Sequence, residues 1–63
     1  MNEHDPIWTA TEASNYMQMP QETLQKWRHI GTGPDFLKIG RHVRYRKSAV
    51  DRWLDTRSRA QTG

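Results

Sequence analysis

The basic side chains between positions 38 and 46 are the residues whose types and spacing most clearly indicate a chemistry. Lys38, Arg44 and Arg46 alternate with apolar residues in two short segments, and Arg41 and His42 lie between those segments. In a paired hairpin we expect the three alternating basic residues on one face, where neighbouring like charges cost stability. A bound polyanion such as a duplex backbone would offset that cost. The alternative is that these charges protect an exposed strand edge from aggregation.

A second set of polar residues lies on one side of a predicted helix. Leu24 and Trp27, three positions apart, indicate the buried side of this helix. Glutamine, lysine and glutamate on its other side could hydrogen-bond to base edges in the major groove of DNA. An ordinary solvated helix face is the alternative. At 3.6 residues per turn, the outward positions are Glu22, Gln25, Lys26 and His29, and the flanking positions are Gln21 and Arg28.

Residues with the spacing of a catalytic or metal site are not apparent. His4, His29 and His42 lie on three separate segments without ligand spacing, and no two carboxylates are placed for acid–base catalysis. Ser48 is better explained as a helix cap than as a nucleophile, and no glycine-rich phosphate loop follows a strand. We therefore expect no enzymatic activity, no small-molecule substrate, no metal and no cofactor.

Length and charge distribution narrow the class of protein. The chain has 63 residues, no cysteine and a net charge of +3, so one small core without disulfides is expected. Residues 1–35 include two basic and five acidic side chains, whereas residues 36–63 include eight basic and two acidic ones. This asymmetry favours a polyanionic partner, because Lys and Arg bound to phosphates release condensed counterions. With no apolar run of about 18 residues and no signal-peptide pattern, we expect a soluble, intracellular protein with no membrane partner.

Two short helices joined by a tight turn are expected to position the second polar set. Thr9 and Glu12 have the spacing of a capping box, which predicts a helix over residues 10–17. Pro20 separates this helix from a second one, which Gly31 ends. The two helices are separated by about three residues, which is the spacing of a helix-turn-helix.

The basic side chains of the first set are expected on a β-hairpin. Leu37 and Ile39, and then Val43 and Tyr45, alternate with polar residues. A loop of three residues would place Ile39 opposite Val43 and Leu37 opposite Tyr45. We prefer this register to a two-residue loop because it creates one apolar face. It leaves Phe36 on the basic face without an explanation.

A third helix is expected to close the core. Ser48 begins an N-cap signature, and apolar residues recur after it at helical spacing. Residues 1–55 are predicted to form the folded domain. Residues 56–63 hold only small, polar and basic side chains and are predicted to be a disordered basic tail. The apolar positions of the third helix are Val50, Trp53 and Leu54.

These motifs, in this order, are similar to those of one protein family. The residues that carry the similarity are Trp8-Thr9, Glu12-Ala13, Tyr16, Thr23-Leu24, Trp27, Gly33-Pro34, Gly40-Arg41, Val43-Arg44-Tyr45-Arg46, Ser48 and Trp53-Leu54. They resemble the excisionase and AlpA-type proteins of the MerR-like winged helix-turn-helix group. The resemblance implies an α+β fold that binds double-stranded DNA, with the second helix in the major groove and the hairpin wing in the adjacent minor groove or on its backbone. The residues that it implicates are Gln21, Glu22, Thr23, Gln25 and Lys26 on the helix and Arg41, His42, Arg44 and Arg46 on the wing.

The resemblance also implies the task of an excisionase, or recombination directionality factor, of a mobile element. Several copies would bind an attachment site side by side, bend it, and direct an integrase toward excision. No dimerisation helix is expected after Leu54, which favours head-to-tail association on DNA. The family usually has serine or a similar cap where this chain has Pro20, and often a basic residue where it has Gln21, so the start of the second helix is less cationic in this chain.

Two alternatives to this task remain open. One is a transcriptional regulator that binds an operator, and the other is a protein-interaction module whose basic wing binds an acidic partner. The expected location is the cytoplasm of a bacterial or phage-infected cell, in association with the nucleoid.

Overall fold

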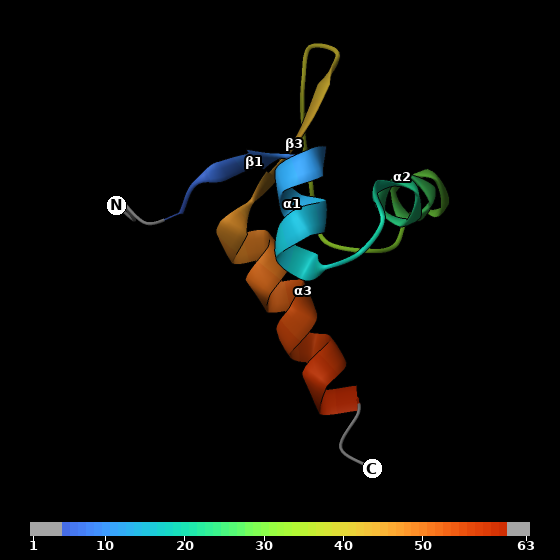
Figure 1. Cartoon of the computed structure of the whole chain (residues 1–63), viewed down its shortest axis with the longest axis vertical. Coiled ribbons are helices and arrows are strands. Elements are labelled where there is room, and N and C mark those ends of the chain that lie inside the picture. Colours follow the sequence, from blue (N-terminus) through green and yellow to red (C-terminus); the bar gives the residue numbers. More distant parts are fainter. Residues whose placement is uncertain (1–4, 61–63) are drawn as a thin grey trace.

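The computed structural model describes residues 5–60, with side chains as far as residue 57. In this part of the chain, three helices pack against a three-stranded antiparallel sheet, as Figure 1 shows. The α+β winged helix-turn-helix architecture predicted from the sequence is therefore confirmed. The elements are, in order, β1 (Ile7–Thr9), α1 (Ala10–Met17), α2 (Gln21–Ile30), β2 (Leu37–Ile39), β3 (His42–Arg46) and α3 (Lys47–Ala60).

The helix-turn-helix forms where the local signals predict it. Thr9 and Glu12 make the capping box: the Glu12 N–H donates to Thr9 Oγ1 at 3.1 Å, and the Thr9 N–H donates to Glu12 Oε1 at 2.9 Å. Gln18, with φ of 58°, ends α1 in the left-handed conformation. Pro20 precedes the first turn of α2, and Gly31 ends that helix with φ of 81°. The turn and both helices thus match the prediction.

The sheet has a strand that the sequence analysis did not predict. Strand order is β1-β3-β2, so β3 lies at the centre and hydrogen-bonds on both sides. In the pairing of β1 with β3, Trp8 lies opposite Tyr45 and Ile7 opposite Arg46. With only three residues, β1 is too short to show a period of two, which explains why pattern reasoning missed it.

The hairpin has a two-residue loop, so the predicted three-residue register is wrong. Ile39 pairs with His42, and Lys38 pairs with Val43. Gly40 has φ of 62°, whereas Arg41 is not among the residues with positive φ. Positive φ at the first loop position alone is the requirement of a type II′ turn, whose twist suits an antiparallel hairpin. Turn geometry therefore overrides the preference for a uniformly apolar face.

The observed register also accounts for Phe36. This residue directly precedes β2, and its ring centroid lies 6.3 Å from that of Tyr45. Phe36 therefore packs on the core side of the sheet, although it remains 40% exposed. The unexplained position of Phe36 in the predicted register was a sign that the register was shifted by one residue.

The start of α3 is capped from the other end of the domain. The Ser48 N–H donates to Asp5 Oδ1 at 2.7 Å, and the Ser48 hydroxyl donates to Asp5 Oδ2 at 2.9 Å. Lys47 N–H donates to the Pro6 carbonyl at 3.0 Å. The predicted role of Ser48 as the N-cap is therefore wrong: Ser48 lies inside the helix, and Asp5 supplies the acceptor.

The third helix is longer than predicted. It continues to Ala60, so residues 56–60 are helical and do not belong to a disordered tail. Thr56 Oγ1 donates to the Trp53 carbonyl at 2.6 Å. Neither proline nor glycine interrupts this stretch, which allows the helix to propagate past the last apolar residue. Residues 61–63, also predicted to be tail, lie outside the described residues.

The core is small and lies between the helices and the inner face of the sheet. Its buried side chains come from four elements: Ala13, Met17, Leu24, Tyr45 and Val50. The three tryptophans pack around it and are partly buried. Tyr16 is 44% exposed, its ring centroid lies 4.6 Å from that of Trp8, and its hydroxyl donates to Asp51.

Candidate nucleic-acid interface

Helix α2 is held against the domain along two flanks. On one flank, Arg28 Nη1 donates to the Tyr45 hydroxyl of β3 at 2.8 Å. On the other flank, the ring of Trp27 lies 4.9 Å from the ring of Trp53 on α3. Leu24 lies between these contacts and is fully buried. These contacts fix the rotation of α2 about its own axis and so determine which residues it presents to a partner.

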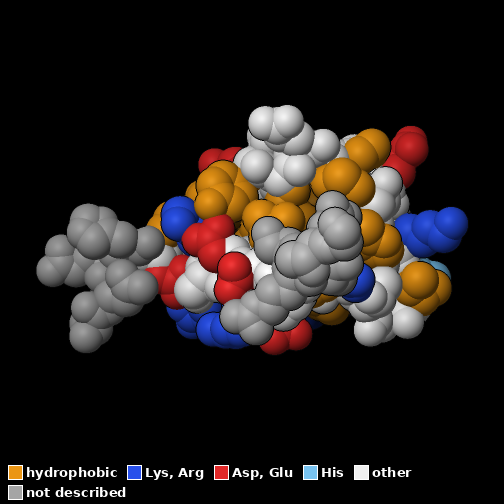
Figure 2. All heavy atoms as spheres, turned by 90° about the horizontal axis from the view of Figure 1, so that it is seen from below, with side chains coloured by type: hydrophobic (Ala, Val, Ile, Leu, Met, Phe, Trp, Pro, Cys, Tyr) orange, Lys and Arg blue, Asp and Glu red, His pale blue; other side chains and the backbone are white. Residues whose placement is uncertain are grey.

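The remaining side of α2 is open. A shallow hollow on it is lined by polar side chains and by Ile30, which is 66% exposed. In Figure 2, α2 forms the right-hand edge of the molecule, where basic, acidic and His side chains project outward. The exposed polar residues on this face are Gln21, Glu22, Gln25, Lys26 and His29.

Two predicted helix residues lie at the margin of this open face. Thr23 and Arg28 are both half-buried. The guanidinium of Arg28 also lies 6.0 Å from the ring of Phe36, so this side chain joins α2 to the base of the wing. Spacing along the chain does not reveal this structural role, because the partners of Arg28 are distant in sequence.

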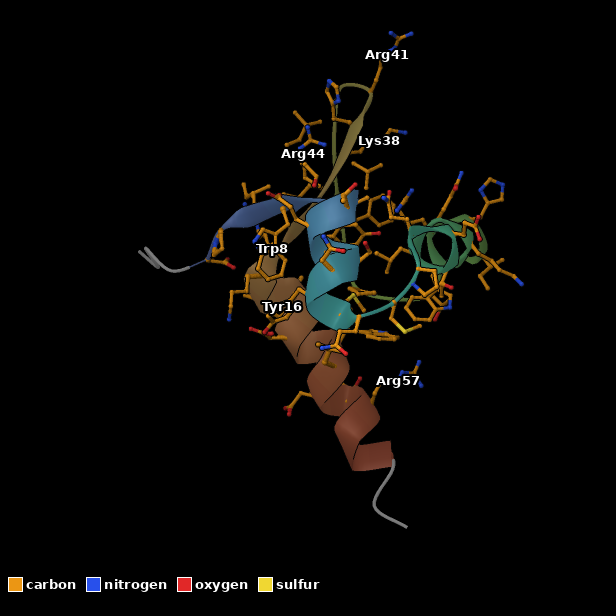
Figure 3. All side chains as sticks on the ribbon, in the orientation of Figure 1. Trp8, Tyr16, Lys38, Arg41, Arg44 and Arg57 are labelled. Carbon is orange, nitrogen blue, oxygen red and sulfur yellow. The ribbon has the colours of Figure 1, made fainter. Side chains whose placement is uncertain are left out.

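The wing projects away from the helices, with Arg41 at its tip (Figure 3). The predicted common face for its three alternating basic residues is wrong. Lys38 pairs with Val43, whereas Arg44 pairs with Leu37, so Lys38 and Arg44 lie on opposite faces. Figure 3 shows these two side chains on opposite sides of the hairpin. The wing thus presents positive charge on both faces and at its tip.

The face of the wing that carries Arg44 is mixed in character. Arg44 is half-buried, and its Nη1 donates to the Val43 carbonyl at 2.8 Å. Arg46 Nη1 lies 4.0 Å from Asp5 Oδ2, at the base of the wing. Ile39 and Ile7 are 54% and 48% exposed. The charge of Arg46 is therefore partly compensated by the Asp5 carboxylate. Arg41 and His42, at the tip of the wing, are exposed.

A family model described as "Helix-turn-helix domain" matches residues 9–58, which is most of the chain. The chain belongs to this helix-turn-helix family. The family includes the excisionase and AlpA-type small DNA-binding proteins. No curated protein matches the chain significantly. Membership supports sequence-specific DNA binding, and the family is not a known enzyme family.

In helix-turn-helix proteins the second helix enters the major groove, which is about 12 Å wide. In this helix-turn-helix chain that element is α2, and its open face carries four of the six helix residues expected to contact DNA: Gln21, Glu22, Gln25 and Lys26. All five predicted wing residues lie on β2, on β3 or in the loop between them. The residues predicted to contact DNA therefore group into two surfaces, one on α2 and one on the wing.

The acidic side chains near the wing and α3 are engaged by the fold. The Ser48 N–H is the main cause that lowers the pKa of Asp5 below its ordinary value. The pKa of Asp51 is lowered mainly by its hydrogen bond from Lys47, which is 2.7 Å long. The same bond raises the pKa of Lys47. These carboxylates are therefore ionised at neutral pH and are compensated locally.

The part of the chain that the structure describes contains no cluster of three or more His, Asp or Glu side chains able to hold a metal ion. Over the same residues, no helix is both long enough and apolar enough to cross a membrane.

Proposed function

We propose that this protein is an excisionase, or recombination directionality factor, of a phage or other mobile element. It binds double-stranded DNA at an attachment site, bends it, and directs an integrase toward excision. Copies associate head to tail on the DNA, in the cytoplasm of a bacterial or phage-infected cell, as part of the nucleoid.

The observation that carries this proposal is the pairing of an open α2 face with a protruding basic wing. Gln25 and Lys26 on α2 can bond to base edges, because glutamine is suited to adenine and lysine to guanine or phosphate. Arg41 lies at the tip of the wing, where an arginine can enter a minor groove. A domain of this kind contacts two adjacent grooves of one duplex.

The wing also has a feature that suits DNA bending. Ile39, at the end of β2, is 54% exposed and lies opposite His42. Proteins that bend DNA through the minor groove often insert an apolar side chain between base steps and so kink the duplex. Ile39 beside Arg41 therefore supports a bending function for this wing.

Salt dependence tests whether DNA is bound through phosphates. If α2 and the wing contact about five phosphates, log K should fall with log salt at a slope near −4.5. Arg44→Ala should flatten this slope by about one and weaken binding to all DNA sequences equally. Gln25→Ala should cost about 1–3 kcal/mol of binding free energy on the preferred site only. An interaction module that binds an acidic protein would show neither result with duplex DNA.

Two further measurements test the excisionase task. A mobility-shift titration on the DNA flanking the gene should give a ladder of complexes, and a single complex at all concentrations would contradict head-to-tail binding. Excision frequency should fall in cells without the gene. If nearby promoters respond and excision does not, the protein is a transcriptional regulator that uses the same surfaces.

A further inference from the structure

The two flanks of α2 lead to two different parts of the domain. Through Arg28 and Tyr45, the first flank adjoins β3 and therefore the base of the wing. Through Trp27 and Trp53, the second flank adjoins α3. The basic side chains of the wing therefore lie on the side of α2 that its first flank faces. On the side of the second flank, α3 is the neighbouring element.

Arg57 is the charged residue at that place. Its guanidinium carbon lies 4.8 Å from the centre of the Trp53 ring, and this ring lies 4.9 Å from that of Trp27. Figure 3 shows Arg57 projecting from α3 toward the side of the molecule on which α2 lies, far from Arg41. The side chain is exposed. Two tilted indole rings in contact thus link this positive charge to α2, the helix that enters the groove.

We propose that Arg57 binds a DNA phosphate on the strand that borders the major groove on the side away from the wing. The proposal rests on the proposed DNA binding by α2 and the wing, and adds a third contact from α3. Arg57 projects to the side of the domain on which α2 lies and away from the wing (Figure 3). A guanidinium in this position can reach the phosphates at the edge of the groove that α2 occupies.

The chemistry of the contact between Arg57 and Trp53 favours a phosphate ligand. A guanidinium that lies over an indole ring uses its flat face for the cation–π contact. Its N–H donors lie around the edge of the group, in a planar fork that matches two phosphate oxygens. The Trp53 ring therefore restrains Arg57 without occupying its donors. Restraint of a long side chain in the free protein also lowers the entropy lost on binding.

The test is a salt titration of duplex binding by the full chain, with a short labelled DNA of mixed sequence as the probe. Arg57→Ala should flatten the slope of log K against log salt by about 0.9, because one counterion fewer is released. At 0.1 M salt, the same slope predicts binding about eightfold weaker than for the unaltered protein. Phosphate-ethylation interference on the preferred site should lose its signal on the strand away from the wing.

Lys47→Ala is the matched control. This residue is also on α3 and carries one positive charge, but it lies against Tyr16 and Asp51. Figure 3 shows Tyr16 on the other side of α1 from α2. Lys47→Ala should therefore leave the slope unchanged. Far-UV circular dichroism of both variants reports whether each is folded. Arg57→Lys keeps the charge and should therefore retain most of the slope of log K against log salt.

The outcomes separate this proposal from the proposed function. If the unaltered protein does not bind duplex DNA, both are wrong. If Arg44→Ala flattens the slope and Arg57→Ala does not, DNA binding stands and the α3 contact is refuted. Equal flattening by Arg57→Ala and Lys47→Ala would show a general effect of net charge, which also refutes a specific contact.

Discussion

The hydrogen bond between Arg28 and Tyr45 links α2, the helix proposed to bind the major groove, to β3, the central strand of the sheet. Tyr45 is 1% exposed, and its hydroxyl accepts from Arg28 Nη1 at 2.8 Å. The substitution Tyr45→Phe keeps the ring and removes only the acceptor. A hydrogen bond to a charged group contributes about 1.5–3 kcal/mol, and we expect the lower end because the half-buried Arg28 can recover part of its hydration.

The expected loss of about 1.5 kcal/mol in the free energy of unfolding corresponds to a fall in Tm of about 6–12 °C for a domain of this size. Urea denaturation followed by tryptophan fluorescence and thermal denaturation followed by circular dichroism measure the two quantities. Arg28→Met and the double variant complete a thermodynamic cycle that isolates the pair from the other contacts of each side chain. A coupling energy near zero, or a loss below about 0.5 kcal/mol for Tyr45→Phe, would refute the role assigned to this bond.

Two other predictions concern the cap of α3 and the loop that follows α2. The Ser48 N–H holds the pKa of Asp5 below its ordinary value of 3.8. The stability that this carboxylate contributes is therefore present above pH 3.8 and is lost as the pH falls through the lower pKa of the folded state. Urea denaturation at a series of pH values measures this loss. Over that acidic window, the free energy of unfolding should fall less for Asp5→Asn than for the unaltered protein. An equal fall would contradict the role of Asp5 as the cap of α3. Gly33→Ala should lower the Tm of the domain more than Gly31→Ala does. Both glycines have positive φ, so both substitutions strain the backbone. An added Cβ at Gly33 would also lie 2.9 Å from Trp27 Cβ, whereas one at Gly31 would meet nothing within 4 Å. Equal shifts in Tm would show that the contact with Trp27 is unimportant.

The helix-turn-helix could be predicted because its signals are local. Thr9 and Glu12 lie three residues apart, and Gly31 directly follows the helix that it ends. Each of these residues acts on its own helix, so spacing along the chain is sufficient to identify its role. The outward set on α2 followed from the same reasoning, since Leu24 is indeed fully buried.

The features that were missed depend on contacts that spacing does not reveal. Asp5 caps α3 across 43 residues, so Ser48 was interpreted as a cap in its own right. The hairpin register depends on the positive φ of Gly40, which allows a two-residue loop. The observed pairing differs from the predicted one by one residue, and this shift places Lys38 on the opposite face from Arg44. A preference for apolar pairs was a weaker guide than the geometry that a two-residue turn requires.

The extent of α3 shows a different limit. Residues 56–63 have no apolar stripe and are predicted to be disordered, yet α3 continues through residues 56–60. Helix propagation costs little once the first turns are held by packing, and this stretch contains no residue that breaks a helix. The same extension places Arg57 over Trp53, so the misjudged segment contains the residue on which the proposed third contact depends.

The central position of β3 has a consequence for the order of events during synthesis. Among the residues that the structure describes, β3 is the last strand, and both of its neighbours precede it. While the ribosome is still adding residues before Arg46, Ile7 and Trp8 have no strand to pair with. The helices α1 and α2 can form early because their hydrogen bonds are local, but long-range pairing must wait for the distant partner. The nascent chain therefore gains the contact between Arg28 and Tyr45, and with it a fixed orientation of α2, only after β3 has emerged.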